Sequence, residues 1–217
     1  MNKADSEEYK KKKQFLTKIL TIYGRKPVLE ALLNADITAH RLHLSESNKA
    51  AKILDEITDL ANKKNIEIRH HSKEALSRIS KNKKQDQGVA LDLHMRNFLM
   101  VESFVENPPP RFDIIALDCV TNPQNVGMII RSIAASPATA ILLPNQGCAK
   151  LDALVIKASA GALFKATIIR CDTLNGGLQQ LLKIPSNIIG LDLSANRKLS
   201  DVQYERSVFV LGNESEG

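Results

Sequence analysis

Short apolar runs separated by segments of helical length fill the second half of the chain. Strands are predicted at 113–119, 139–143, 166–171, 187–191 and 207–211, and helices at 125–136, 151–163 and 173–183. Strands that alternate with helices of this length form a largely parallel sheet that is covered on both faces. The pattern therefore predicts an α/β domain over residues 112–217.

Two loops of this predicted domain carry the polar residues of a candidate site. The block NPQNVGMIIR at 122–131 follows the apolar run IIALDCV, and the block GNESEG at 212–217 follows the run VFVL. In open α/β sheets, ligands bind beyond the carboxyl ends of the strands. Both loops lie at such ends and are rich in Asn, Gly, Glu and Arg. We therefore expect them to share one site.

The first part of the chain is basic and predicts a second, smaller α/β domain over residues 22–96. Residues 1–96 hold 20 Lys and Arg against 13 Asp and Glu, a net charge of +7, whereas the rest hold 10 against 11, a net charge of −1. This split suggests that the first domain meets a polyanion, and an ordinary solvated basic face is the alternative. We expect a basic extension at 1–21 and a linker at 97–111, which contains NPPPR.

Several classes of protein do not fit the composition. No apolar stretch approaches the ~20 residues of a spanning helix, and the N-terminus has no secretory signal, so we expect a cytoplasmic protein without a membrane segment. Three cysteines without such a signal predict free thiols in a reducing compartment. The five histidines lack the spacing of zinc ligands, so no metal is predicted.

The two loop blocks resemble the first two motifs of the SpoU (TrmH-like) RNA 2′-O-ribose methyltransferases of the SPOUT superfamily. They match the patterns N-P-x-N-x-G-x-I-x-R and L-G-N-E-x-x-G, and KASAGALF at 157–164 resembles the family's spacer helix. YGRKPVLEALL and QGVALDL resemble the start and end of its RNA-binding domain. The resemblance implies methyl transfer from S-adenosylmethionine to a ribose 2′-hydroxyl in 23S ribosomal RNA, with transfer RNA as the alternative. It also implies a trefoil knot and a homodimer.

The resemblance also suggests roles for individual residues. A guanidinium stays protonated in proteins and is a poor base, so we expect Arg131 to bind the target phosphate and stabilise the alkoxide. Asn is a good N-cap, so Asn125 is expected to begin the helix and to orient Arg131 or the ribose. Glu214 is expected to hold Arg131 or Asn125. The remaining candidates are Gly212, Asn213 and Leu191 for the cofactor, and Arg25, Lys26 and Arg131 for RNA.

Two other hypotheses remain at this point. The family's third motif, a strand with a Ser/Asn loop and a final helix, would follow Gly217, so we expect the chain to be a truncated form. If the protein ends at Gly217, we expect a catalytically inactive RNA-binding protein with weak or no cofactor binding. A nucleotide-binding enzyme of Rossmann type is disfavoured, because no G-x-G-x-x-G follows the first strand of either domain.

Overall fold

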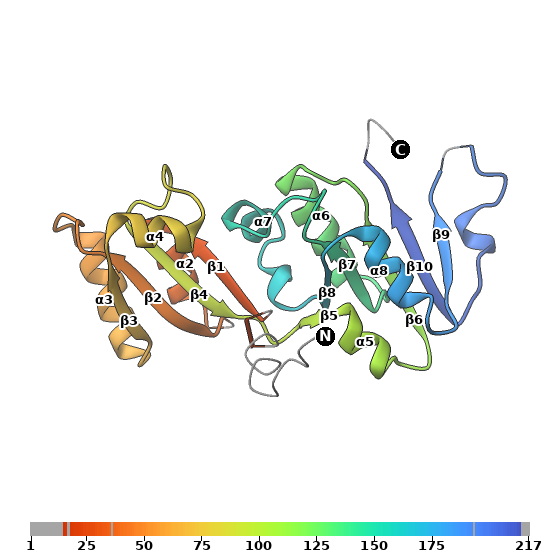
Figure 1. Cartoon of the computed structure of the whole chain (residues 1–217), viewed down its shortest axis with the longest axis horizontal. Coiled ribbons are helices and arrows are strands. Elements are labelled where there is room, and N and C mark those ends of the chain that lie inside the picture. Colours follow the sequence, from red (N-terminus) through yellow and green to blue (C-terminus); the bar gives the residue numbers. More distant parts are fainter. Residues whose placement is uncertain (1–14, 17, 36, 193, 214–217) are drawn as a thin grey trace, which may run out of the picture. The chain divides into compact units, whose positions relative to one another are not determined.

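The computed structural model of the chain describes residues 15–213 except 17, 36 and 193. The chain divides into two compact units, with the boundary between Arg96 and Asn97 (Figure 1). Each unit has its own sheet. The first unit carries the basic surplus, and the second carries the two loop blocks.

The first unit is a four-stranded mixed sheet with three helices. Its elements are β1 (Ile19–Tyr23), α2 (Arg25–Leu33), β2 (Ala39–Ser45), α3 (Lys52–Lys63), β3 (Glu67–His71), α4 (Lys73–Ser80) and β4 (Val89–His94). The strand order is β1-β4-β2-β3, and only β2 and β3 run parallel. Helices α2 and α3 pack together, whereas α4 contacts all four strands. Ser72 is the N-cap of α4, because its hydroxyl accepts from the Ala75 amide at 3.3 Å.

The sheet of the first unit has one apolar face and one polar face. Leu20, Ile22, Leu42, Leu44 and Leu91 alternate along their strands and are buried. Their neighbours on the other face form a polar row across the sheet, in which Thr21 pairs with Asp92, Asp92 with Arg41, and Arg41 with Glu67. The Glu67 carboxylate lies 2.7 Å from Arg41 and 2.6 Å from Arg69, and these arginines lower its pKa.

The second unit is a six-stranded, fully parallel sheet. Its elements are β5 (Phe98–Met100), α5 (Val101–Glu106), β6 (Phe112–Leu117), α6 (Pro123–Ala134), β7 (Ala140–Pro144), α7 (Ala153–Ala158), η1 (Ala162–Phe164), β8 (Ile168–Cys171), α8 (Leu174–Leu181), β9 (Asn187–Gly190), η2 (Leu199–Asp201) and β10 (Arg206–Leu211). The order is β5-β8-β7-β6-β10-β9. The prediction of a largely parallel sheet is confirmed.

Helices cover this sheet unevenly. Helices α5 and α8 contact each other and share a core cluster with one face of the sheet, which includes Phe104, Ile114, Leu142, Leu181 and Val208. Helices α6 and α7 pack together, and α6 contacts β7 (Figure 1). On β6 and β10, Ile115 and Leu211 alternate with residues of that cluster and are only half-buried. The face of β6 and β10 that carries Ile115 and Leu211 is therefore less fully covered by helices than the opposite face.

Three sequence-based expectations about the elements were wrong. The expected linker at 97–111 contains β5 and α5, whose Phe98, Val101 and Phe104 are buried. The extension expected at 1–21 overlaps β1, which begins at Ile19 and pairs with β4. The helix expected at 151–163 splits into α7 and η1, because Ala160 and Gly161 have positive φ angles of 49° and 79°.

Neither a membrane-spanning helix nor a metal-binding cluster occurs among the residues that the structure describes. No helix there is long and apolar enough to cross a membrane. The same residues contain no group of three or more His, Cys, Asp or Glu side chains that could hold a metal ion. The three cysteines are free thiols.

Candidate active site at the carboxyl edge of the parallel sheet

Helix α6 begins at the first loop block, directly beyond the carboxyl end of β6. The Asn122 side chain accepts from the Gln124 amide at 2.8 Å, which makes Asn122 the N-cap, and Pro123 takes the first helical position. The expectation that Asn125 caps the helix was therefore wrong, because Asn125 lies in the first turn. From this turn, Asn125 lines a hollow together with residues of β6 and β10.

One side of α6 approaches α7 very closely at Gly127. A Cβ atom built on Gly127 would lie 2.4 Å from the Ala158 Cβ and 2.9 Å from both the Ser159 nitrogen and the Val155 oxygen. Such distances leave no room for a side chain. The backbone of α6 at Gly127 therefore lies directly against α7. This contact fixes the position of the helix that carries Asn125 and Arg131.

A hollow of about 480 Å³ lies on another side of α6, against β6 and β10. Its wall on the helix is formed by Asn125, Met128, Ile129, Ser132 and Ile133, which recur at helical spacing. Its other residues are Ile115, Val120, Leu191, Leu211, Gly212 and Asn213. The hollow is largely apolar, and its polar groups include the side chains of Asn125, Ser132 and Asn213 and the backbone of Gly212.

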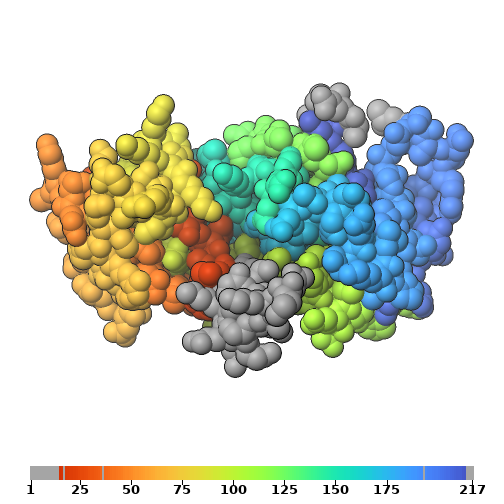
Figure 2. Space-filling model, in the orientation of Figure 1, coloured from red at the N-terminus to blue at the C-terminus, as the bar shows by residue number. Residues whose placement is uncertain are grey.

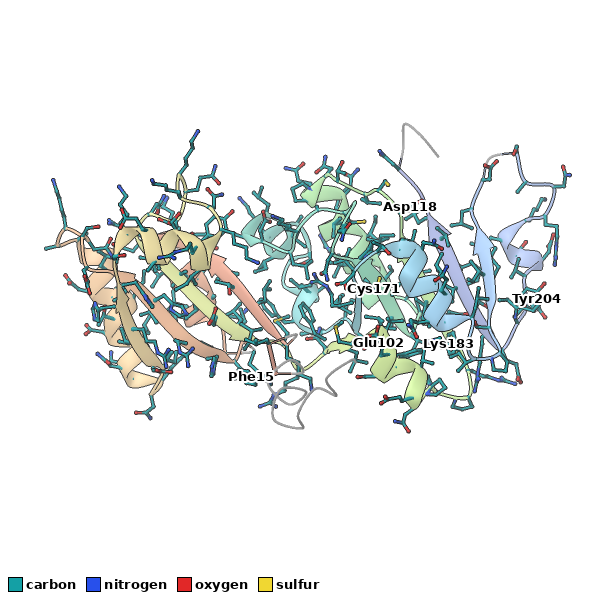
Figure 3. All side chains as sticks on the ribbon, in the orientation of Figure 1. Phe15, Glu102, Asp118, Cys171, Lys183 and Tyr204 are labelled. Atoms are coloured by element: carbon teal, nitrogen blue, oxygen red, sulfur yellow. The ribbon has the colours of Figure 1, made fainter. Side chains whose placement is uncertain are left out.

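A second hollow of about 820 Å³ lies beside β9, under the segment that includes η2. It shares Leu191, Leu211, Gly212 and Asn213 with the first hollow. Its own lining includes Asp192, Arg197 and Tyr204, and Figure 3 shows Tyr204 in that segment near β9. The two hollows thus meet at the loops that follow β9 and β10.

Hydrogen bonds fix the loop between β6 and α6. The Asp118 amide donates to the Leu211 carbonyl at 2.9 Å, and the Ala149 amide donates to the Val120 carbonyl at 2.9 Å. Asp118 therefore lies beside the end of β10 (Figure 3). The Cys148 thiol lies 3.5 Å from the Leu117 carbonyl, and burial raises the pKa of that thiol. The loop is held by β10 on one side and by the segment that follows β7 on the other, which gives the site a fixed backbone.

The structure brings four of the predicted site residues together. Asn125, Leu191, Gly212 and Asn213 line the same hollow. Arg131 is exposed on α6 and does not line it, because six residues turn a helix by about 240° from Asn125. Glu214 lies outside the described residues. Sequence reasoning missed Met128 and Ser132, although their spacing of three and seven residues from Asn125 could have indicated them.

The first unit carries a separate candidate site, at the end of its sheet. Three loops meet there, and we call them the loop platform: 24–26, 46–51 and 81–88. Arg25 is held by Gln87 through two hydrogen bonds of 3.1 and 3.2 Å, Asn48 donates to Gly88 at 2.8 Å, and Asn82 donates to Tyr23 at 2.9 Å. In Figures 1 and 2 the yellow segment that follows α4 projects from this end.

The loop platform is strongly basic. It carries the predicted RNA contacts Arg25 and Lys26 together with Lys49, Lys81, Lys83 and Lys84, of which all but Arg25 are exposed. Of its two carboxylates, Asp86 is buried and accepts from the Ser80 hydroxyl and the Gly88 amide at 3.0 Å each, and Glu46 is exposed. Sequence reasoning did not bring these lysines together with Arg25 and Lys26.

The fold and both sites define an α/β protein with a SPOUT-type parallel-sheet domain and a basic accessory domain. Residues 113–217 match the SpoU rRNA Methylase family, and residues 21–99 match the RNA 2′-O ribose methyltransferase substrate binding family. The chain belongs to the SpoU methylase family. The predicted family and fold class are confirmed.

Relatives and solved structures agree with this assignment. The chain is 30% identical over 201 residues to a tRNA/rRNA methyltransferase of Mycobacterium avium and 31% identical over 202 residues to one of Mycobacterium tuberculosis. These matches cover 91% of this chain and 64% and 62% of the relatives. The chain thus spans less than two thirds of the length of these relatives.

Two crystal structures share the fold. One is the AdoMet-bound rRNA methyltransferase from Sinorhizobium meliloti, with a TM-score of 0.57 and 18% identity over 98% of this chain and 76% of that one. The other is the SpoU methyltransferase AviRb from Streptomyces viridochromogenes with AdoMet, with a TM-score of 0.56 and 17% identity over 98% and 78%.

Proposed function

We propose that this protein is an S-adenosylmethionine-dependent RNA methyltransferase that acts on a ribose 2′-hydroxyl, with 23S ribosomal RNA as its substrate and transfer RNA as the alternative. The observation that carries the proposal is the meeting of Asn125, Leu191, Gly212 and Asn213 around one hollow. Asn125, Gly212 and Asn213 belong to the patterns by which the sequence resembles the family, and Leu191 directly follows β9. A homodimer, a trefoil knot and a cytoplasmic location remain predictions of that resemblance.

The hollows suit S-adenosylmethionine in size and chemistry. Volumes of about 480 and 820 Å³ fall within the range of small-molecule sites, roughly 300–1,000 Å³. Leu191 and Leu211 offer apolar contacts to an adenine ring, and Asn125 and Asn213 offer donors and acceptors. Gly212 has no side chain to keep a ligand from the backbone at the end of β10. When bound, the cofactor supplies the electrophilic methyl group.

The chain's own residues have two tasks in this reaction. The 2′-hydroxyl must be placed in line with the methyl group, because positioning is a large part of the rate. It must also lose a proton, although it is a very weak acid at neutral pH. We propose that Arg131, exposed on α6, binds the target phosphate and stabilises the developing alkoxide. Asn125 and Glu214 are proposed to orient these groups.

Leu191→Arg is expected to weaken S-adenosylmethionine binding at least about tenfold, which isothermal titration calorimetry would measure. Leu191 lines both hollows, so a longer cationic side chain there would fill them and repel the positively charged sulfonium. Its side chain is 40% exposed, so the protein is expected to fold normally. Leu182→Arg is the matched control, since Leu182 is 58% exposed and lines neither hollow. Equal affinities for the two variants would contradict the proposed cofactor site.

The loop platform is proposed to bind the RNA backbone. Lysine and arginine side chains bind phosphates largely through charge, so affinity depends steeply on salt. Lys26→Ala combined with Lys83→Ala is expected to weaken RNA binding about tenfold and to reduce the salt slope by about 2. Fluorescence anisotropy at several salt concentrations would measure both. Lys63 and Lys64 at the other end of α3 provide a control pair, whose replacement should leave the slope unchanged.

A non-catalytic RNA-binding protein is the second candidate function. It is favoured by one observation, the basic loop platform, which lies in the first unit and does not depend on the hollows of the second. RNA binding with no S-adenosylmethionine binding would support this alternative.

A further inference from the structure

Four side chains form a hydrogen-bonded chain across the sheet of the first unit. Thr21 on β1 donates from its hydroxyl to Asp92 on β4 at 2.6 Å. The second oxygen of Asp92 lies 3.1 Å from Nε2 of His43 on β2, and Nδ1 of His43 lies 2.9 Å from Nε2 of His71 on β3. All four strands contribute one member. His43 is buried at 4% exposure, and His71 is half-buried.

When both histidine rings are neutral, the donors and acceptors fix where the protons lie. The Asp92 carboxylate can only accept, so His43 donates to it from Nε2. Neutral His43 then has no proton on Nδ1 and accepts there from Nε2 of His71. Nδ1 of His71 is left without a proton. Within these four side chains, it is the position where a proton can be added without breaking a hydrogen bond.

The chain of bonds can therefore take up one proton readily. Protonated His71 still donates to His43, which still donates to the Asp92 carboxylate, so the added charge is balanced through two hydrogen bonds. A second proton, on Nδ1 of His43, would place two N–H groups opposite each other. The carboxylate is kept ionised: burial raises the pKa of Asp92, but the hydrogen bonds from His43 and Thr21 outweigh it and lower the pKa overall.

The groups around His71 oppose its protonation in the free protein. Burial lowers the pKa of His71, and positive charge on His43, whenever that ring is protonated, and on Arg69 lowers it further, whereas Glu46 raises it. The charge of Arg41 acts on Asp92, at the other end of the chain of hydrogen bonds from His71. The charged side chains of α4, which packs against β3, are exposed (Lys73, Glu74 and Arg78). In most molecules of the free protein, the His71 ring is therefore neutral at neutral pH, until an anion binds.

His71 adjoins the loop platform. The Glu46 amide donates to the His71 carbonyl at 2.9 Å, and Ser45 lies opposite His71 in the sheet. The backbone amide of Ser45 donates to the Gly88 carbonyl, and the Asn48 side chain donates to the same carbonyl. His71 is thus joined through β2 to two of the three loops that form the platform. An RNA phosphate bound there would lie near the ring and favour its charged form.

We propose that Thr21, Asp92, His43 and His71 form a proton-binding site linked to RNA binding, in which an RNA phosphate at the loop platform draws one proton onto Nδ1 of His71. This inference rests on the proposed RNA-binding function. Linkage is reciprocal, so protonation strengthens RNA binding as much as RNA favours protonation. Affinity should rise as the pH falls, and level off below the pKa of His71 in the free protein. The rise is about tenfold if RNA raises that pKa by about one unit.

Anisotropy titrations with a fluorescein-labelled RNA hairpin from about pH 8 to about pH 5.5, at constant ionic strength, test this link. His71→Gln keeps a donor for His43 but cannot take up the proton, so its affinity should lose the pH dependence of the unaltered protein. His70→Gln, which alters an exposed neighbour outside the chain of bonds, should keep it. Asp92→Asn removes the balancing charge and should shift the rise to lower pH. An unchanged pH dependence in His71→Gln would overturn the proposal.

Nitrogen NMR of the histidine rings in the free protein separates this inference from the RNA function. The expected result is that His71 gains its proton at Nδ1 in one step, while His43 keeps its proton on Nε2. Protonation of His43 before His71 would overturn the proton site alone, whatever the RNA affinity. Absence of RNA binding at every pH would overturn the proposed RNA function and the link with it.

Discussion

Replacing Gly127 with alanine is expected to lower the free energy of unfolding by about 1–3 kcal/mol. The added Cβ would meet the Ala158 Cβ at 2.4 Å and two backbone atoms of α7 at 2.9 Å, so the two helices would have to separate. Alanine favours a helix over glycine by about 1 kcal/mol, which offsets only part of this cost. Denaturant unfolding followed by circular dichroism would measure the change.

Gly190 provides the control for this prediction. A Cβ built on Gly190 meets nothing within 4 Å, so Gly190→Ala should leave the free energy of unfolding nearly unchanged. The comparison separates the loss of space at α7 from the general effect of replacing a glycine. A Gly127→Ala protein as stable as the unaltered one would show that α6 and α7 do not pack as closely as described.

Replacing Arg131 with lysine is expected to lower kcat at least about a hundredfold, with S-adenosylmethionine affinity unchanged within about twofold. Arg131 lies on α6 but does not line the hollow, so the cofactor site keeps its walls. Lysine keeps the charge but loses the planar pair of donors that binds a phosphate in bidentate fashion. Methyl transfer to RNA, measured alongside calorimetric cofactor titration, would separate the two effects.

Arg111→Lys is the control for this variant. Arg111 is an exposed arginine whose ion pair with Glu205 spans 3.2 Å, and exposed pairs of this kind contribute little to stability. Its replacement should change neither rate nor affinity. Near-normal methyl transfer by Arg131→Lys would contradict the proposed role of Arg131. Parallel loss of cofactor binding would instead assign Arg131 to the cofactor.

The sequence predicted most strands of the second unit. Apolar runs such as the one before Asn122 gave β6 to β10 within a few residues, because buried parallel strands are nearly continuous apolar segments. β5 and α5 were missed, since NPPPR suggested a linker and the short segment 98–106 buries its apolar side chains only against distant elements. β1 was missed because lysines precede it and its partner, β4, lies about 70 residues further along the chain.

The candidate site shows the same limit. The pattern of apolar runs in the sequence placed Asn125, Leu191 and Gly212 near strand ends. Only the order of β6, β10 and β9 in the sheet brings these residues to one hollow. Asn122 rather than Asn125 caps α6, because proline at the next position fixes the helix start. The chain of bonds from Thr21 to His71 was not predicted, since its members lie far apart in sequence and meet through strand register.

The most direct test of the proposed function is transfer of tritiated methyl groups from S-adenosylmethionine to ribosomal RNA, followed by alkaline hydrolysis. Alkaline cleavage of RNA needs a free 2′-hydroxyl, so a ribose-methylated nucleotide remains in an uncleaved dinucleotide. Label is expected in such dinucleotides, and that label should be lost with Leu191→Arg. Label in mononucleotides would show methylation of a base instead. No label in ribosomal or transfer RNA, despite measurable cofactor binding, would contradict the proposed activity.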